Sequence, residues 1–107
     1  MSRFMRLFVM FDLPVTSPEE RKAAAQFRKF LLNDGYYMMQ FSVYIRICNG
    51  HEAAQKHISR VSAKIPEKGS VRALIITERQ YEAMKVFCGK KNADFDKKAP
   101  EQLVLSF

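Results

Sequence analysis

Residues 4–11 read FMRLFVMF, a nearly unbroken apolar run that ends at Asp12 and is soon followed by Pro14. Apolar residues at both odd and even positions are typical of a β-strand that is covered on both faces. Asp12 therefore stands where a strand gives way to a loop, held by a rigid element yet open to solvent. Sites that position a metal ion or a phosphate are often built in this way. The alternative is an Asp12 that only helps to form the turn before Pro14.

Length and charge predict one domain with a polyanionic partner. The chain has 107 residues, of which 48% are hydrophobic, enough for the core of a single domain. Its 18 Lys and Arg residues outnumber 11 Asp and Glu residues, and the resulting net charge of +7 favours nucleic acid over membrane as the partner. The alternative is a protein that is cationic without such a partner.

No segment has the pattern of a membrane span or a signal peptide. The first apolar run is too short to cross a bilayer and contains Arg6. Cys48 and Cys88 are too few and too isolated for a disulfide framework or a zinc site. His51 and His57 fall on a polar helix face, where surface positions are the simplest interpretation. We therefore expect a cytoplasmic protein with reduced thiols and no membrane partner.

The segment after the first strand predicts a helix. Ser17, with Pro18 next and Glu20 three residues on, forms a capping box, and the helix should end before Gly35. One face of this helix carries four like charges without an interspersed acid, which makes them candidates for nucleic-acid binding. These residues are Arg21, Lys22, Arg28 and Lys29. The alternative is an ordinary solvated helix face.

Residues 36–48 (YYMMQFSVYIRIC) predict a single second strand with one apolar and one polar face. The apolar positions, expected in the core, are Phe41, Val43, Ile45 and Ile47, and the polar positions are Gln40, Ser42, Tyr44 and Arg46. A second helix should follow to about Ile65, with Asn49 and Glu52 as its capping pair. A second basic stripe on its outer face consists of Lys56, Arg60 and Lys64.

The remaining patterns complete an α/β chain. Residues 71–77 predict a third strand, 78–82 a helical turn and 84–88 a short fourth strand. This order predicts a ferredoxin-like α+β sandwich of the βαββαβ type, with an additional C-terminal strand. We expect the domain to span residues 1–88, while residues 89–107 form a polar loop and a strand that completes the sheet of a dimer. An apolar chain end is natural for a strand that pairs with a partner.

Asp12 is the strong candidate for chemistry in a single chain, because the sequence contains no glycine-rich phosphate loop and no metal-ligand spacing. In a homodimer that pairs through the uncovered sheet face, two Asp12 side chains can approach each other across the twofold axis. Mg²⁺ suits such a site, since it takes one or two carboxylates and keeps several waters. Asp12 is thus the predicted catalytic and metal-binding residue, with Ser42 and Tyr44 as polar neighbours.

Taken together, several segments resemble the second CRISPR-associated protein family, the small ferredoxin-like subunit of the spacer-acquisition complex. The resemblance covers nearly the whole chain. Each segment is a weak family motif by itself, and the resemblance rests on the order and spacing of all of them. They are residues 7–14 (LFVMFDLP), 21–22 (RK), 35–36 (GY), 40–44 (QFSVY), 71–81 (VRALIITERQY) and 103–107 (LVLSF). Within them, residues 77–81 are most similar to versions from type II systems.

The resemblance implies a homodimer with Asp12 as the metal-binding residue at its interface, and a CRISPR integrase subunit as partner. Family members are described as metal-dependent endonucleases on RNA or double-stranded DNA, and others as scaffolds held between two integrase dimers. Both functions stay open at this point. A third alternative is a stand-alone ferredoxin-like module, either a toxin-type RNase or a nucleic-acid-binding regulator.

Overall fold

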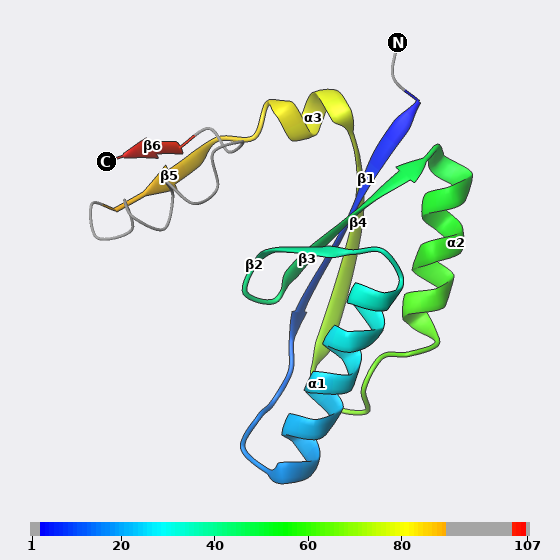
Figure 1. The fold of residues 1–107 in the computed structure, drawn as a ribbon, viewed down its shortest axis with the longest axis vertical. Helices are drawn as coiled ribbons and strands as arrows, with labels where there is room; N and C mark the ends of the chain where they lie inside the picture. Colours follow the sequence, from blue (N-terminus) through cyan, green and yellow to red (C-terminus); the bar gives the residue numbers. More distant parts are fainter. Residues whose placement is uncertain (1–2, 90–103, 107) are drawn as a thin grey trace.

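A computed structural model describes residues 3–89 and 104–106 of the chain. Its main sheet is antiparallel and has four strands in the order β2-β3-β1-β4 (Figure 1). The strands are β1 (Phe4–Asp12), β2 (Tyr37–Gln40), β3 (Val43–Asn49) and β4 (Ser70–Thr77), and the helices between them are α1 (Pro18–Asn33) and α2 (His51–Ser62). The βαββαβ order and the sheet confirm the predicted ferredoxin-like fold class.

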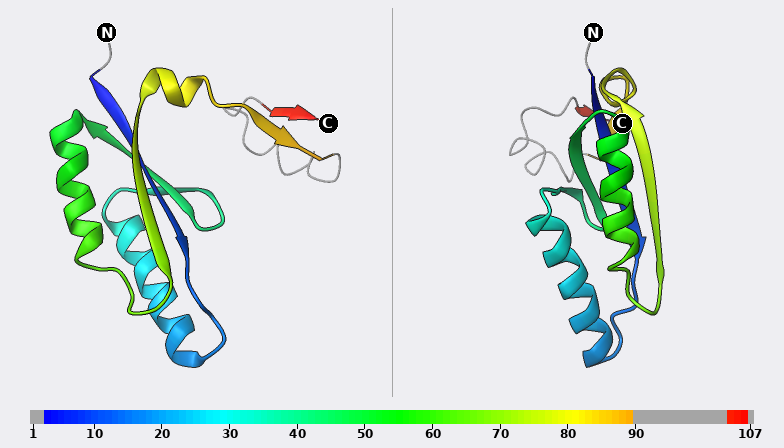
Figure 2. Two further views of the ribbon diagram at one scale, coloured as in Figure 1. Left: turned by 180° about the vertical axis from the view of Figure 1, so that it is seen from behind. Right: turned by 90° about the vertical axis from the view of Figure 1, so that its right-hand side faces the viewer.

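Both long helices cover the same face of the sheet. Alternate residues of β1 point into this layer, and Leu7 and Val9 are fully buried there. The helices contribute apolar side chains to the same core cluster, which includes Phe27, Leu31, Ala54 and Val61. Figure 2, right, shows the domain from the side, with α1 and α2 both to the left of β4. Neither helix covers the other face of the sheet, which carries the even-numbered residues of β1.

The strand predicted over residues 36–48 is in fact two strands joined by a tight turn. Gln40 pairs with Val43, so Phe41 and Ser42 form the tip of a β2–β3 hairpin. Ser42 has a φ of 64°, a left-handed conformation that residues other than glycine seldom adopt. The prediction missed this turn because it contains no Gly, Pro, Asn or Asp.

The predicted core face of this region was also wrong. Tyr44 lies opposite Val9 on the helix-covered face and is only 3% exposed. By contrast, Phe41 is 88% exposed and Ile47 is 46% exposed, although Ile45 is fully buried. Alternation separates two faces of a strand but does not say which face the helices cover, and here a tyrosine ring fills the space beneath them.

Helix α2 is shorter than predicted. It ends at Ser62, and Ile65, the residue predicted to close it, is 52% exposed. Its N-cap is Gly50, with a φ of 101° and no side-chain hydrogen bond, so the predicted capping pair of Asn49 and Glu52 does not form. The capping box of α1 is confirmed, with Ser17 as N-cap and Glu20 at its third position.

After β4 the chain forms α3 (Glu78–Glu82), and then β5 (Val86–Cys88) pairs in parallel with β6 (Val104–Ser106). This confirms an additional C-terminal strand, but the predicted strand over residues 84–88 is shorter and joins β6 instead of the main sheet. Of the predicted polar loop, residues 90–101 lie outside the described part of the chain. Pairing of residues 102–107 with a partner chain stays a prediction. Among the described helices, none is long and apolar enough to cross a membrane.

Candidate metal and nucleic-acid site

Asp12 ends the central strand and is exposed to solvent. On one side, the ladder places it opposite Ser70 of β4. On the other side, the preceding residue, Phe11, donates its backbone N–H to the carbonyl oxygen of Ser42 at 3.0 Å. The end of β1 therefore lies between the start of β4 and the β2–β3 turn. The backbone that carries the Asp12 side chain is fixed by both neighbours.

Gly69 lies directly against the backbone of this strand end. Its φ is +95°, and a Cβ atom there would lie 2.5 Å from the carbonyl oxygen of Asp12 and 2.9 Å from Cδ2 of Leu13. Both the left-handed backbone and the close approach require a glycine. Nothing local in residues 66–69 indicates which backbone this connection will contact.

The two predicted neighbours of Asp12 are placed differently. Ser42 adjoins the end of β1 through its backbone carbonyl. Tyr44 is buried under the helices and stacks on Phe11 with 5.6 Å between the ring centroids. Tyr44 therefore packs against β1 on the face that the helices cover. Side chains alternate along a strand, so Asp12 belongs to the opposite face.

The donor set at Asp12 fits one kind of metal ion. Within residues 3–89 and 104–106, no group of three or more His, Cys, Asp or Glu side chains could hold a metal ion. One carboxylate per chain, with no thiolate or imidazole beside it, does not make a zinc site. It fits Mg²⁺, which prefers oxygen ligands and retains several of its waters.

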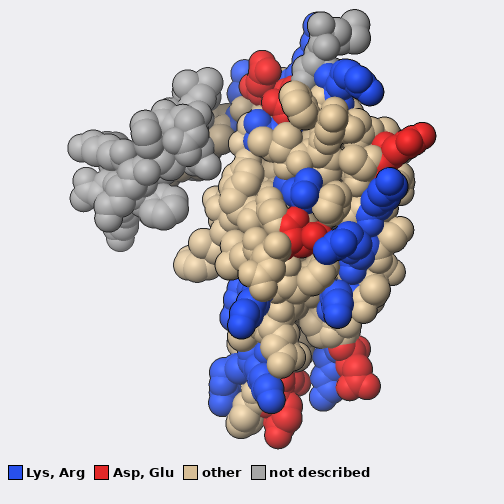
Figure 3. Space-filling model, turned by 45° about the vertical axis from the view of Figure 1, so that its right-hand side comes forward, with Lys and Arg blue, Asp and Glu red and all other residues tan. Residues whose placement is uncertain are grey.

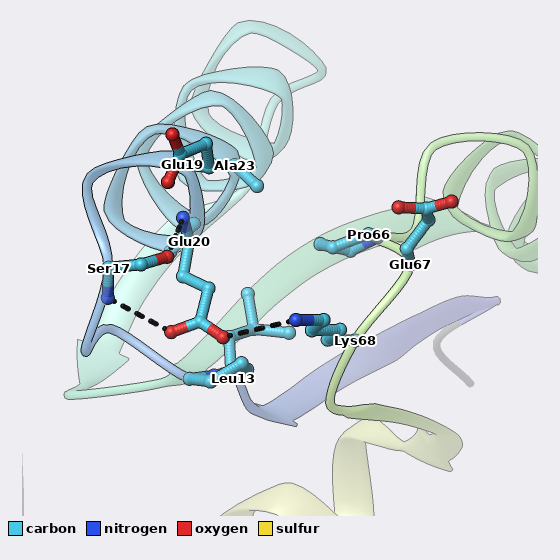
Figure 4. Close-up of a pocket in the computed structure, with 10 residues that line it drawn as sticks. Leu13, Ser17, Glu19, Glu20, Ala23, Pro66, Glu67 and Lys68 are labelled. Carbon is cyan, nitrogen blue, oxygen red and sulfur yellow. Dashed lines mark hydrogen bonds and ion pairs between the residues drawn. The ribbon is translucent and has the colours of Figure 1, made fainter.

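A groove of about 420 Å³ opens beside the loop that follows Asp12 (Figure 4). Glu20 lies at this groove and accepts hydrogen bonds from the Thr16 hydroxyl at 2.7 Å and the Ser17 N–H at 3.1 Å. These bonds, the Thr16 hydroxyl first, lower the pKa of Glu20, and Lys68 at 3.6 Å adds to the effect. The loop from Leu13 to the start of α1 is therefore tied to the helix and to the α2–β4 connection.

The predicted nucleic-acid-binding residues of α1 share one outward face. All four are exposed, and within the described chain none of them forms an ion pair: Arg21, Lys22, Arg28 and Lys29. Figure 3 shows Lys and Arg side chains spread along one face of the molecule, with acidic side chains among them. Cations without an acidic partner remain available to phosphates.

The second basic stripe is interrupted. Arg60 pairs with Asp34, with 2.7 Å between Nη2 and Oδ1, and Lys64 lies beyond the end of α2. His57 also contacts Asp34 through Nδ1 at 3.0 Å, and its side chain is only 17% exposed. The interpretation of His57 as a surface residue was therefore wrong, because no local pattern indicates that α2 packs beside the end of α1.

The uncovered face of the sheet carries several exposed apolar side chains. They are Phe4 on β1, Tyr37 on β2, Ile47 on β3 and Leu74 on β4. The register places them on the same side of the sheet as Phe8 and Met10. Exposed apolar side chains that gather on one face of a sheet are typical of interaction surfaces.

These features define a class: a small ferredoxin-like domain with an uncovered sheet face and a single-carboxylate candidate metal site. The family model described as "CRISPR associated protein Cas2" matches residues 5–84. The chain belongs to this family, as the sequence predicted.

Named relatives are similar over most of their length. The chain is 58% identical over 85 residues to the CRISPR-associated endoribonuclease Cas2 of Acidovorax ebreus, covering 79% of this chain and 83% of the relative. It is 48% identical over 101 residues to the protein of that name from Parvibaculum lavamentivorans, covering 94% and 99%. The corresponding protein of Ligilactobacillus salivarius is 43% identical over 101 residues, covering 94% and 100%.

Proposed function

We propose that this chain is a CRISPR adaptation subunit that works as a homodimer with an integrase partner on double-stranded DNA, and that it has Mg²⁺-dependent endonuclease activity on RNA or DNA. The observation that carries the proposal is Asp12, an exposed carboxylate on rigid backbone, in a chain of the Cas2 family. Relatives bear the name CRISPR-associated endoribonuclease, which supports phosphodiester cleavage as the chemistry. Family membership also favours this function over a stand-alone toxin-type or regulatory module.

The proposed dimer forms through the uncovered sheet face. Three apolar side chains at its centre and edge, Ile47, Leu74 and Phe4, are each about half exposed in the single chain. Pairing this face with a second copy would remove them from water at a gain of about 25 cal/mol per Å² of apolar surface. A twofold axis through the face would bring the two Asp12 residues toward each other, since both end the central strand.

Asp12 and its symmetry mate are the residues that would hold the metal. Without a cation, two nearby carboxylates repel each other, so a dimer of this geometry favours Mg²⁺ binding. A bound Mg²⁺ supplies electrostatic stabilisation for the negative charge of a phosphodiester. The chain's own contribution is to hold the carboxylate on rigidly placed backbone, which the contacts of Gly69 and Ser42 support.

Duplex binding in this proposal uses the outward face of α1. Arg21 and Lys22 lie in the first turns of the helix, where the helix dipole also favours an anion. Arg28 and Lys29 continue the same face two turns further along. Such contacts are with phosphates and are independent of base sequence.

A scaffold without cleavage is the second candidate, and the sparse site favours it. Asp12 is one carboxylate per chain, and among the described residues it belongs to no group of three or more His, Cys, Asp or Glu side chains that could hold a metal ion. In the scaffold role, the dimer would hold the integrase subunits apart on the duplex. The type II-like subtype belongs to the proposal as well, supported by residues 77–81, in which Thr77 and Gln80 form a capping box.

Asp12→Asn separates the two candidates, because it removes the charge and keeps the size. We expect the variant to lose cleavage of RNA and duplex DNA in the presence of Mg²⁺, measured against wild type with and without a chelator. Glu19→Gln, an exposed acid on α1, is the matched control and should cleave normally. Acquisition of new spacers in cells then decides the role: retained acquisition indicates a scaffold, and lost acquisition indicates that Asp12 is needed for adaptation. Unchanged cleavage by Asp12→Asn would remove the proposed chemistry.

A further inference from the structure

The tip of the β2–β3 hairpin lies beside the end of β1. The ladder between β1 and β3 pairs Met10 with Val43, and the bond from the Phe11 N–H to the Ser42 carbonyl continues it by one residue. The next residues on the two segments are Asp12 and Phe41. The hairpin tip is therefore part of the surroundings of the candidate metal site.

Phe41 is 88% exposed, more than any other large hydrophobic residue among those described. Isolated apolar residues on a surface are common and need no explanation by themselves. Phe41 differs in two respects: it precedes Ser42, whose carbonyl oxygen accepts a bond from the residue before Asp12, and the backbone that carries it is constrained. The following residue, Ser42, has a φ of +64° and a bonded carbonyl, so the ring is presented from a constrained turn. Backbone held in sparsely populated conformations is concentrated at functional sites.

We infer that Phe41 stacks on an unpaired nucleobase whose adjoining phosphate lies at Asp12; this inference rests on the proposed function. Every nucleobase has a flat apolar face, and an exposed aromatic ring offers the complementary surface. A cation for the backbone of the same nucleic-acid strand is Arg72 of β4, which is exposed on the uncovered face two residues along from Ser70, the ladder partner of Asp12. Phe41 is thus a positioning residue that selects single-stranded segments at the site, whereas the face of α1 holds duplex.

The test is a binding titration with short single-stranded RNA and DNA that carry 2-aminopurine, alongside a duplex of the same sequence. Phe41→Ala should bind both single strands about 5- to 150-fold more weakly, the loss expected for one stacked base, and should bind the duplex normally. Leu32→Ala is the matched control, because Leu32 is an apolar residue 53% exposed on α1. A stronger effect with RNA than with DNA would identify RNA as the source of the base.

Phe41→Trp provides a direct signature. The chain contains no Trp, so the new indole would be the sole tryptophan and would report only on this position. We expect single-stranded RNA or DNA to quench its fluorescence, and we expect Asp12→Asn in the same background to lose cleavage without losing the quenching.

Three results would overturn the inference that Phe41 stacks on a base. If wild type binds the probes and Phe41→Ala binds them equally well, Phe41 does not stack, while the proposed function stands. If light scattering shows that Phe41→Ala has lost its dimer, Phe41 is an interface residue instead. If wild type binds neither single strand nor duplex, the proposed function itself fails.

Discussion

The guanidinium of Arg6 donates to both carboxylate oxygens of Glu78, at 2.5 Å and 3.3 Å, and so ties the central strand to the short helix α3. The same guanidinium donates to the Tyr37 hydroxyl at 2.7 Å and lies 4.0 Å from the centre of the Tyr81 ring. The bond to Glu78 raises the pKa of Arg6 and keeps it charged. Both side chains of the pair are mostly buried, which makes this contact different from an exposed ion pair.

Glu78→Ala should therefore destabilise the fold. The change leaves a largely buried guanidinium without its acceptor, at a cost of about 1.5–3 kcal/mol, the range for hydrogen bonds to charged groups. Urea unfolding at fixed protein concentration measures the change in the free energy of unfolding. Glu82→Ala is the control, because Glu82 is an exposed acid of the same helix. Equal effects of the two substitutions would mean that the Arg6 contact contributes nothing specific.

Gly69→Ala should displace the backbone at Asp12. The added Cβ would lie 2.5 Å from the Asp12 carbonyl oxygen, in addition to the strain of a left-handed backbone. Gly50→Ala isolates the strain, because Gly50 has a similar φ of +101° and nothing within 4 Å of the added atom. We expect about 1–3 kcal/mol of destabilisation for Gly50→Ala, because a φ of 101° with a ψ of 169° is a conformation essentially restricted to glycine. Gly69→Ala should cost about 1–3 kcal/mol more. Only Gly69→Ala should also weaken Mg²⁺ binding, measured by calorimetry.

The basic face of α1 should be visible in the salt dependence of duplex binding. Changing Arg21, Lys22 and Arg28 together to Gln should lower the log–log salt slope by about 0.9 for each residue that meets a phosphate. A charge-matched set of exposed cations elsewhere, Lys56, Lys64 and Arg79, serves as control. If the two triple variants lose affinity and slope equally, α1 is not the binding face and only net charge matters.

Leu74→Glu should break the proposed dimer. Leu74 is 52% exposed on the uncovered sheet face, and a charge buried there would weaken association by about 10- to 100-fold or more, given what burial of a leucine contributes. Val15→Glu, at a residue that is 51% exposed but outside the sheet, should leave the mass from light scattering unchanged. A wild-type protein that is monomeric at micromolar concentration would refute the dimer before either variant is made.

Glu20 should contribute to stability at neutral pH and lose this contribution in acid. Its pKa is lowered in the folded chain, chiefly by the hydrogen bond from the Thr16 hydroxyl. A lowered carboxyl pKa means that the stabilisation is present above the unfolded value and disappears as the pH falls through the folded value. Glu20→Gln keeps an acceptor for the cap and removes the titration, so its unfolding free energy should depend less on pH below 4.5, the ordinary value. Urea unfolding of wild type and of Glu20→Gln at several pH values measures this difference.

Local patterns were sufficient where the relevant contacts are local. The capping box of Ser17 and Glu20 joins residues three apart, and the helix starts as predicted. The apolar run before Asp12 predicted the central strand, because burial on both faces leaves a distinctive composition. The order of these elements was enough for the fold class, and the family followed from their spacing.

The surroundings of Asp12 depend on contacts between distant segments. Nothing near Gly69 in the sequence indicates that it will lie against Asp12, and the hairpin turn at Phe41 and Ser42 was missed altogether. The pairing of Arg60 and His57 with Asp34 likewise joins the end of α1 to α2. Such juxtapositions follow from how helices and strands pack and not from local preference.

The sequence alone determined most of the elements, the fold class and the position of Asp12 at a strand end. Only the tertiary structure decided which face of β3 is buried, so that Tyr44 went under the helices and Ile47 to the uncovered face. The physical reason is that alternation defines two faces of a strand with equal clarity. Which face becomes the core depends on where α1 and α2 pack, and that depends on the whole chain.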